Sequence, residues 1–161
     1  MNIIEVNPPR DYRGLEYPVG DSMGAVRLYA ETLAPYVDQL VAKAESESRG
    51  PILVCRGSSG AMLTSALSMF MNARPRVFHV KKDGEDSHSH HSNYVRPYGA
   101  AYIVVDDFVD TGRTLVEISK AIHEPKMYGL VLGNVSAKDA TKRLERLDGI
   151  TFDNLINLNV R

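Results

Sequence analysis

The chain has 161 residues, of which 43% are hydrophobic, and a formal net charge of -1 at pH 7. Such a chain is long enough to bury the core of one domain, and its charge excludes a general attraction to nucleic acid or acidic membranes. Its single cysteine, Cys55, excludes an internal disulfide and fits a reducing compartment. Because no stretch resembles a signal peptide or approaches the roughly 18 apolar residues of a membrane span, we expect a soluble, cytoplasmic protein.

The first predicted elements are an arm and a long helix. Prolines and glycines interrupt residues 1–20, so we expect an irregular arm in which residues 3–4 add a short strand. Apolar residues then recur at helical spacing over 26–44, which predicts a helix. Pro35 is expected to kink or split this helix, and the exposed-looking run over residues 45–49, followed by Gly50-Pro51, to end it.

A strand, helix and strand are predicted next. Residues 52–55 form a short apolar strand, 56–60 a tight polar loop, and 63–70 a helix with one apolar face. Residues 77–79 lie in a second strand, which ends where Lys81-Lys82 begin. Such a unit implies two parallel strands joined by a right-handed crossover.

A long polar segment follows at residues 83–100. It has no apolar period and exceeds an ordinary connection in length, so we expect a mobile loop with a role at an active site.

The second half of the chain alternates strands and helices in the same way. We predict a strand over 102–105, a helix that stops before Pro125, a strand over 130–135, a helix over 136–147 and a last strand or tail over 150–158. This order predicts a single α/β domain over residues 1–161, with a mostly parallel twisted sheet flanked by helices. Ligands of such sheets bind at the carboxyl ends of the strands.

The stretch from Tyr102 to Leu115 carries the strongest chemical signal. Asp106 and Asp107 directly follow a β-branched apolar run, and a Thr-Gly-Arg-Thr turn precedes the next helix. Paired carboxylates can hold a metal or sugar hydroxyls, and free N–H groups at a helix start suit a phosphate. A simpler interpretation is that the two aspartates only terminate the strand.

The sequence IVVDDFVDTGRTL resembles the loop with which type I phosphoribosyltransferases bind 5-phosphoribosyl 1-pyrophosphate, PRPP. The upstream sequence ILVCRGSSGA resembles the pyrophosphate-binding loop of that family, and residues 83–100 are similar to its mobile active-site cover. The resemblance extends over roughly residues 50–135. It implies the fold of that family, with a small irregular hood over the base.

The resemblance also assigns roles to residues. Asp106 and Asp107 would hold the ribose hydroxyls of PRPP, directly or through Mg²⁺. The 5′-phosphate would be surrounded by Asp110, Thr111, Gly112, Arg113 and Thr114. The pyrophosphate would be met by Arg56, Gly57, Ser58, Lys81 and Lys82.

Asp110 directs the resemblance toward the 6-oxopurine branch, which includes the hypoxanthine-guanine and xanthine-guanine enzymes. In that branch an aspartate before the Thr-Gly turn faces the purine and handles its N7 proton, which would make Asp110 catalytic. The alternative is that Asp110 only caps the turn.

Three features depart from the pattern of that branch. Asn134 stands where those enzymes carry a base-binding lysine, and an amide can still donate a hydrogen bond to the base. The stacking aromatic has no clear counterpart, although Phe152 is a candidate. The arm with Arg10, Tyr12, Arg13 and Tyr17 can supply the hood instead, as the N-terminus does in orotate enzymes.

The remaining candidate groups have simpler interpretations. His88, His90 and His91 belong to the predicted cover, where they reach the pyrophosphate, form a weak zinc motif or remain solvated. Cys55 is expected to be a small core residue, and His79 to be structural.

The sequence therefore predicts a Mg²⁺-dependent glycosyltransferase of nucleotide metabolism. It would transfer the phosphoribosyl group from PRPP to a nucleobase, a 6-oxopurine of purine salvage, and release pyrophosphate. The resemblance implies a homodimer, and we expect no nucleic-acid or membrane partner. An orotate or pyrimidine enzyme, a PRPP- or nucleotide-binding regulator without efficient catalysis, and an unrelated phosphate-binding α/β protein are the alternatives.

Overall fold

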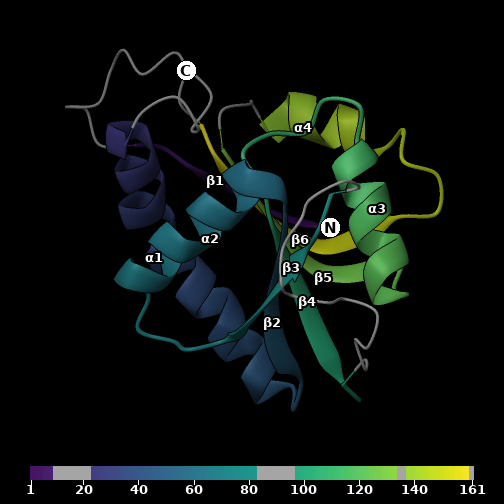
Figure 1. The fold of residues 1–161 in the computed structure, drawn as a ribbon, viewed down its shortest axis with the longest axis horizontal. Helices are drawn as coiled ribbons and strands as arrows, with labels where there is room; N and C mark the ends of the chain where they lie inside the picture. The colour runs from purple at the N-terminus through teal and green to yellow at the C-terminus, as the bar shows by residue number, and fades with distance from the viewer. Residues whose placement is uncertain (9–22, 83–96, 134–136, 160–161) are drawn as a thin grey trace.

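The computed structural model of the chain describes residues 1–8, 23–82, 97–133 and 137–159 (Figure 1). The predicted arm beyond residue 8, most of the cover loop, and Asn134 lie outside these ranges. Within them the elements are, in order, β1 (Asn2–Val6), α1 (Met23–Ser46), β2 (Gly50–Arg56), α2 (Gly57–Phe70), β3 (Arg76–Val80), β4 (Ala100–Val105), α3 (Arg113–Ile122), β5 (Lys126–Gly133), α4 (Ala137–Leu144) and β6 (Thr151–Leu158). None of the described helices is long and apolar enough to cross a bilayer.

The six strands form one sheet in the order β1-β6-β5-β4-β2-β3, and every pairing between them is parallel. Helices α1 and α2 cover one face of the sheet, and α3 and α4 cover the other (Figure 1). This arrangement confirms the predicted α/β class. Because all the strands run parallel, their carboxyl ends lie along the same end of the sheet, called here its carboxyl edge.

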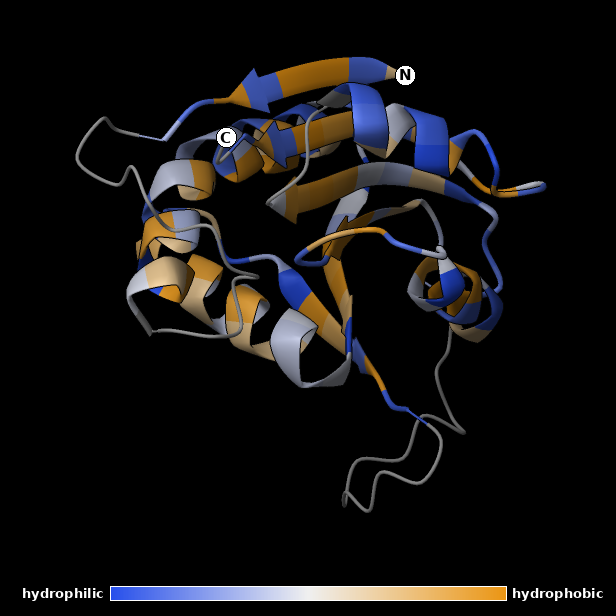
Figure 2. Cartoon of the chain, turned by 90° about the horizontal axis from the view of Figure 1, so that it is seen from above, coloured by the Kyte–Doolittle hydropathy of each residue, from blue (hydrophilic) through white to orange (hydrophobic). Residues whose placement is uncertain are grey.

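The two faces of β4 explain why its sequence is an unbroken apolar run. Ile103 and Val105 pack in the cluster under α1 and α2, whereas Tyr102 and Val104 pack in the cluster under α3 and α4. Successive side chains of a strand point to opposite faces, so a strand covered on both sides must be apolar throughout. In Figure 2 the strands are largely orange, the colour of hydrophobic residues, whereas the helices carry both orange and blue.

Helix α1 runs through Pro35 without being split, contrary to one of the two outcomes predicted for this proline. Proline removes the N–H group that would bond the carbonyl four residues earlier. Pro35 lies on the exposed side of the helix, where water can reach the carbonyl that it leaves unpaired.

The helix ends within residues 45–49, the run predicted to close it, and Gly50-Pro51 already belong to β2. The last helical residue is Ser46, and Ser48 just beyond it has a left-handed φ of 58°. The N–H of Arg49 donates to the carbonyl of Ala44 at 2.9 Å, and the N–H of Ser48 to that of Glu45 at 2.9 Å. These two bonds form the usual end of a helix around a left-handed residue, a position that glycine occupies more often than serine.

Other boundaries differ by a few residues. The polar loop predicted over 56–60 is wrong, since α2 starts at Gly57 directly after β2. Strand β5 starts at Lys126 instead of residue 130, helix α4 ends at Leu144 instead of residue 147, and the last segment is a full strand, β6.

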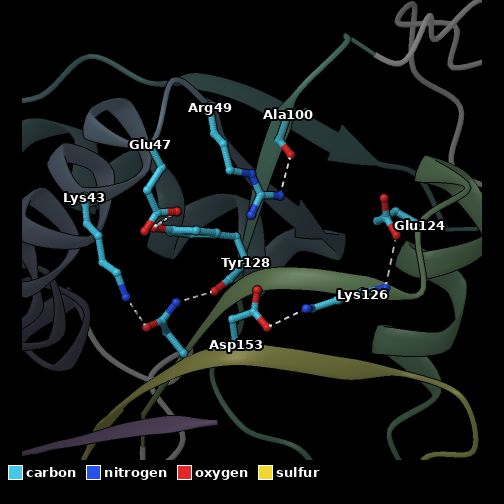
Figure 3. A network of polar contacts seen from close by, with 9 residues as sticks. Lys43, Glu47, Arg49, Ala100, Glu124, Lys126, Tyr128 and Asp153 are labelled. Atoms are coloured by element: carbon cyan, nitrogen blue, oxygen red, sulfur yellow. Dashed lines mark hydrogen bonds and ion pairs between the residues drawn. The ribbon is translucent and has the colours of Figure 1, made fainter.

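A polar network closes the amino ends of the strands, at the edge of the sheet opposite to the carboxyl ends (Figure 3). The guanidinium of Arg49 lies 4.7 Å from the ring centre of Tyr128 and donates to the carbonyl of Ala100 at 2.9 Å. The hydroxyl of Tyr128 donates to Glu47 at 3.0 Å. This network joins the end of α1 to β4 and β5, so it serves the stability of the sheet.

Candidate functional site

A cavity of about 220 Å³ lies at the carboxyl edge of the sheet. Its lining comes from the β2–α2 junction through Arg56 and Ser59, from the end of β3 through Lys82, and from residues 106–115 between β4 and α3. The parallel sheet brings these three segments together, because each follows the carboxyl end of a neighbouring strand.

Asp106 and Asp107 form the floor of this cavity. Both are buried, with 6% and 9% of their surface exposed. The Asp106 carboxylate accepts the N–H of Asp107 at 3.0 Å, and the Asp107 carboxylate accepts the N–H of Phe108 at 3.0 Å. Their backbone is tied to β5 by the N–H of Asp106 and the carbonyl of Asp107. The two carboxylates are therefore held in fixed orientations toward the cavity.

This acidic pair is electrostatically unfavourable when it stands alone. Burial, together with the adjacent Asp107 carboxylate, raises the pKa of Asp106 to about 8. The positive charge of Lys82 acts to lower this pKa. A pair of close carboxylates in a buried site retains a proton at neutral pH unless a cation compensates their charge. The pair is thus suited to bind a cation or sugar hydroxyls.

The loop after the acidic pair opens into the amino end of α3. The N–H of Val116 donates to the carbonyl of Gly112 at 3.1 Å, and the Thr111 hydroxyl accepts the N–H of Arg113 at 3.4 Å. The amides of Thr114 and Leu115 are in the first turn, where no helical carbonyl precedes them. Because these residues line the cavity, the helix start presents donors and the positive end of its dipole to an anion.

Gly112 is required for this loop by both its backbone and its surroundings. Its φ is 76°, and a β-carbon there would lie 2.2 Å from Cδ2 of Leu147. Leu147 follows α4, so the turn after α4 packs directly against the loop that surrounds the candidate phosphate site.

Asp110 lies at the rim of the cavity and is 73% exposed. Its Oδ1 is 3.7 Å from Nη1 of Arg143 on α4, and the same guanidinium donates to the carbonyl of Val109. The side chain that accepts an N–H group of this turn is that of Thr111, whose hydroxyl accepts from Arg113. This bond does not involve the Asp110 carboxylate.

The cationic side of the cavity is formed by Arg56 and Lys82. Nε of Arg56 is buried and has no hydrogen-bond partner among the described residues. A β-carbon at Gly57, whose φ is 70°, would lie 2.4 Å from Cε of Lys82, so the lysine chain passes directly over this glycine. A buried, unpaired donor beside a lysine suits an anion.

Most of the predicted site residues meet in this cavity. Those that line it are Arg56, Lys82, Asp106, Asp107, Asp110, Thr111, Gly112, Arg113 and Thr114. Gly57, Ser58 and Lys81 do not line it, and Ser59 does. Cys55 is 1% exposed, which confirms it as a core residue.

Three supporting residues were missed by the sequence analysis of the site: Tyr29, Arg143 and Leu147. Tyr29 is fully buried, and its hydroxyl donates to the Asp106 carbonyl at 2.9 Å. A tyrosine on the apolar face of a helix is a signal that could have found it, because a buried hydroxyl needs a partner. No local pattern marks Arg143 or Leu147, whose contacts depend on the packing of α4.

The resemblance to type I phosphoribosyltransferases implies Mg²⁺ at this site. Among the described residues, no group of three or more His, Cys, Asp or Glu side chains is placed to hold a metal ion. Mg²⁺ is commonly held by one or two carboxylates together with substrate oxygens and water. The adjacent carboxylates of Asp106 and Asp107 fit this mode, because they are hard oxygen ligands whose mutual repulsion a cation relieves.

Comparison with known proteins identifies the fold. No family model matches the chain, and no curated protein matches it either. An orotate phosphoribosyltransferase of Mycobacterium tuberculosis H37Rv, solved in complex with inorganic phosphate, is 18% identical with a TM-score of 0.50, over 85% of this chain and 72% of that one. An orotate phosphoribosyltransferase of Francisella tularensis is 24% identical with a TM-score of 0.50, over 85% and 68%. A HGPRT-ase of Leishmania tarentolae in complex with GMP is 16% identical with a TM-score of 0.49, over 90% and 85%. The chain has the α/β fold of the type I phosphoribosyltransferases.

Proposed function

We propose that this chain, with the fold of the type I phosphoribosyltransferases, is a PRPP-dependent phosphoribosyltransferase. The observation that carries the proposal is the meeting, in one cavity, of a buried acidic pair, a helix start with free amides, and two cations. A ribose that carries a phosphate at one end and a pyrophosphate at the other needs these three kinds of group at once.

Each part of PRPP has a matching segment in this proposal. Asp106 and Asp107 accept hydrogen bonds from the ribose hydroxyls, and residues 111–114 enclose the 5′-phosphate with amides and hydroxyls. Arg56 and Lys82 contact the pyrophosphate, with the unpaired Nε of Arg56 as one donor.

Asp106 and Asp107 would also hold Mg²⁺ in the proposed enzyme. When bound, the ion stabilises the negative charge of the leaving pyrophosphate. It also offsets the repulsion between the two carboxylates, which adds to burial in raising the pKa of Asp106.

The proposed reaction is a displacement at the anomeric carbon of the ribose. The bond from this carbon to the pyrophosphate oxygen breaks, and a bond to a ring nitrogen of the base forms. Arg56 and Lys82 stabilise the charge that develops on the leaving group. The carboxylate of Asp110, at the rim of the cavity, accepts the proton that the base nitrogen loses.

The proposed acceptor is a 6-oxopurine, because Asp110 precedes the Thr-Gly turn as in that branch. Asn134, which lies outside the described residues, is proposed as a base contact. We further propose a cytoplasmic homodimer built from a single domain over residues 1–161. Light scattering after size-exclusion chromatography tests the dimer.

A panel of bases tests the function. The purified protein is incubated with PRPP, Mg²⁺ and one of hypoxanthine, guanine, xanthine, adenine, uracil or orotate, and pyrophosphate release is measured. We expect release with a 6-oxopurine and none from the Asp106→Asn/Asp107→Asn variant. If pyrophosphate were released with orotate alone, orotate would be the acceptor in place of a 6-oxopurine, and the reaction class would stay the same.

Binding measurements complete the panel. PRPP binding by calorimetry without pyrophosphate release from any base would favour a PRPP-binding regulator. Absence of both binding and release would refute the proposed function.

A further inference from the structure

Arg143 of α4 contacts two consecutive residues of the loop that carries Asp110. Its Nη1 donates to the carbonyl of Val109 and lies 3.7 Å from Oδ1 of Asp110. One guanidinium therefore bonds to the backbone before Asp110 and lies within ion-pair distance of the carboxylate itself. Arg143 does not line the cavity, so it acts on the site through its contacts with the loop.

The helix that carries Arg143 is itself held firmly. Ala140 is fully buried and Leu144 is 7% exposed, and both pack in the core cluster beneath α3 and α4. Beyond the helix, Leu147 packs against Gly112 of the same loop. Arg143 thus connects Asp110 to a fixed element, while the carboxylate of Asp110 is mostly exposed.

We propose that Arg143 is a positioning residue, which holds the Asp110 carboxylate in the orientation required for proton transfer from the base. This rests on the proposed function, in which Asp110 is the proton acceptor. An exposed aspartate samples several rotamers, and a misplaced catalytic group loses rate steeply with distance.

The role differs from that of a stabilising salt bridge. Arg143 is 34% exposed and Asp110 is 73% exposed, and an ion pair between exposed side chains contributes little to folding. Loss of Arg143 should therefore change the rate of transfer to the base more than it changes folding or PRPP binding. Lysine should restore the activity only in part, because it lacks the planar fork that serves a carbonyl and a carboxylate together.

The test uses Arg143→Gln with Arg146→Gln as a matched control. Arg146 has the same charge, follows three residues later and is exposed. We expect Arg143→Gln to lower kcat/KM for the base by roughly ten- to a hundredfold, with the KM for PRPP within about twofold of the wild type. Arg146→Gln should change neither value. In the Asp110→Asn background, Arg143→Gln should add little further loss, because the two residues act as one unit.

A second measurement does not depend on activity. Hydrogen exchange followed by mass spectrometry reports the amides of residues 107–115, and we expect faster exchange in Arg143→Gln than in Arg146→Gln or the wild type. If no base is turned over but this exchange increases, the proposed function fails, and only the ordering of the Asp110 loop by Arg143 stands. Unchanged exchange, an equal effect of both arginine variants, or additive losses with Asp110→Asn would overturn the inference.

Discussion

The hydroxyl of Tyr29 donates a 2.9 Å hydrogen bond to the main-chain carbonyl of Asp106, a residue 77 positions further along the chain. The same hydroxyl lies 3.4 Å from the carbonyl of Val131 at the neighbouring strand end. Burial, and then the nearby Asp106 and Asp107 carboxylates, hold the pKa of Tyr29 well above its usual range. The hydroxyl therefore keeps its proton and remains a donor, and α1 supports the acidic pair from beneath the sheet edge.

Tyr29→Phe should keep the packing of the ring but remove this support. We expect a loss of about 1–2 kcal/mol in the free energy of unfolding, because a buried acceptor loses its donor. PRPP affinity should fall as well, because the strand end that orients the acidic pair becomes looser. Urea denaturation and PRPP titration calorimetry measure the two effects.

Tyr36→Phe provides the control for this variant. Tyr36 lies on the same helix and is only partly buried, so loss of its hydroxyl should leave both measurements unchanged. Equal effects of the two variants would show that the Tyr29 hydroxyl has no special role at the site.

The acidic pair predicts how stability varies with pH. Asp106 has a pKa of about 8 in the folded protein, against an ordinary value of 3.8 for an aspartate. Between these values the folded state binds more protons than the unfolded state, so the free energy of unfolding falls as pH rises from about 4 to about 8. One such proton accounts for a slope of about 1.4 kcal/mol per pH unit.

Denaturation at pH 5.5 and pH 7.5 in the presence of a chelator tests this expectation. The wild type should lose stability at the higher pH, and Asp106→Asn should lose clearly less. Mg²⁺ together with PRPP should restore stability mainly at pH 7.5. A variant with the same pH dependence as the wild type would contradict the assignment of the retained proton to this pair.

Gly112→Ala should damage the loop of residues 111–114, the proposed site of the 5′-phosphate, in two ways. A left-handed conformation costs a residue with a β-carbon about 1–2 kcal/mol, and the contact with Leu147 adds strain. We expect a loss of stability and weaker binding of inorganic phosphate, measured by denaturation and calorimetry.

Gly149→Ala separates the two causes. Gly149 has a similar φ of 73°, but a β-carbon there would meet nothing within 4 Å. This variant should show the backbone cost alone and should bind phosphate normally. Leu147→Ala should partly rescue Gly112→Ala, and a failure to rescue would show that the contact with Leu147 is unimportant.

The sequence was most informative where a local pattern had only one physical outcome. The β-branched apolar run before Asp106 favoured a buried strand, and the Thr-Gly turn before an apolar period of helical spacing favoured a helix start. The end of α1 was predicted only to within a few residues, because the left-handed residue that follows it is Ser48, where glycine is more usual. Arg143 and Leu147 could not be predicted, since their contacts arise only when α4 packs beside the loop.

Arg56→Lys should weaken anion binding although it keeps the charge. Nε of Arg56 is buried without a hydrogen-bond partner among the described residues, and lysine has no equivalent donor in that place. We expect the affinity for pyrophosphate to fall by about tenfold, the value of one lost charge-assisted hydrogen bond. Arg76→Lys, on the exposed start of β3, is the control, and equal affinities of the two variants would argue against a role for Nε.

Asp110→Asn distinguishes a catalytic aspartate from a sugar-binding one. If Asp110 accepts the proton of the base, turnover should fall by about a hundredfold or more while PRPP affinity stays near the wild-type value, because the interaction is made only in the transition state. Asp107→Asn should behave in the opposite way, since that buried carboxylate is proposed to bind the ribose, and its loss should weaken PRPP binding itself. Steady-state kinetics with the best acceptor base and PRPP calorimetry separate the two patterns. An equal loss of PRPP affinity in both variants would place Asp110 in the sugar site. Another group would then accept the proton that the base loses.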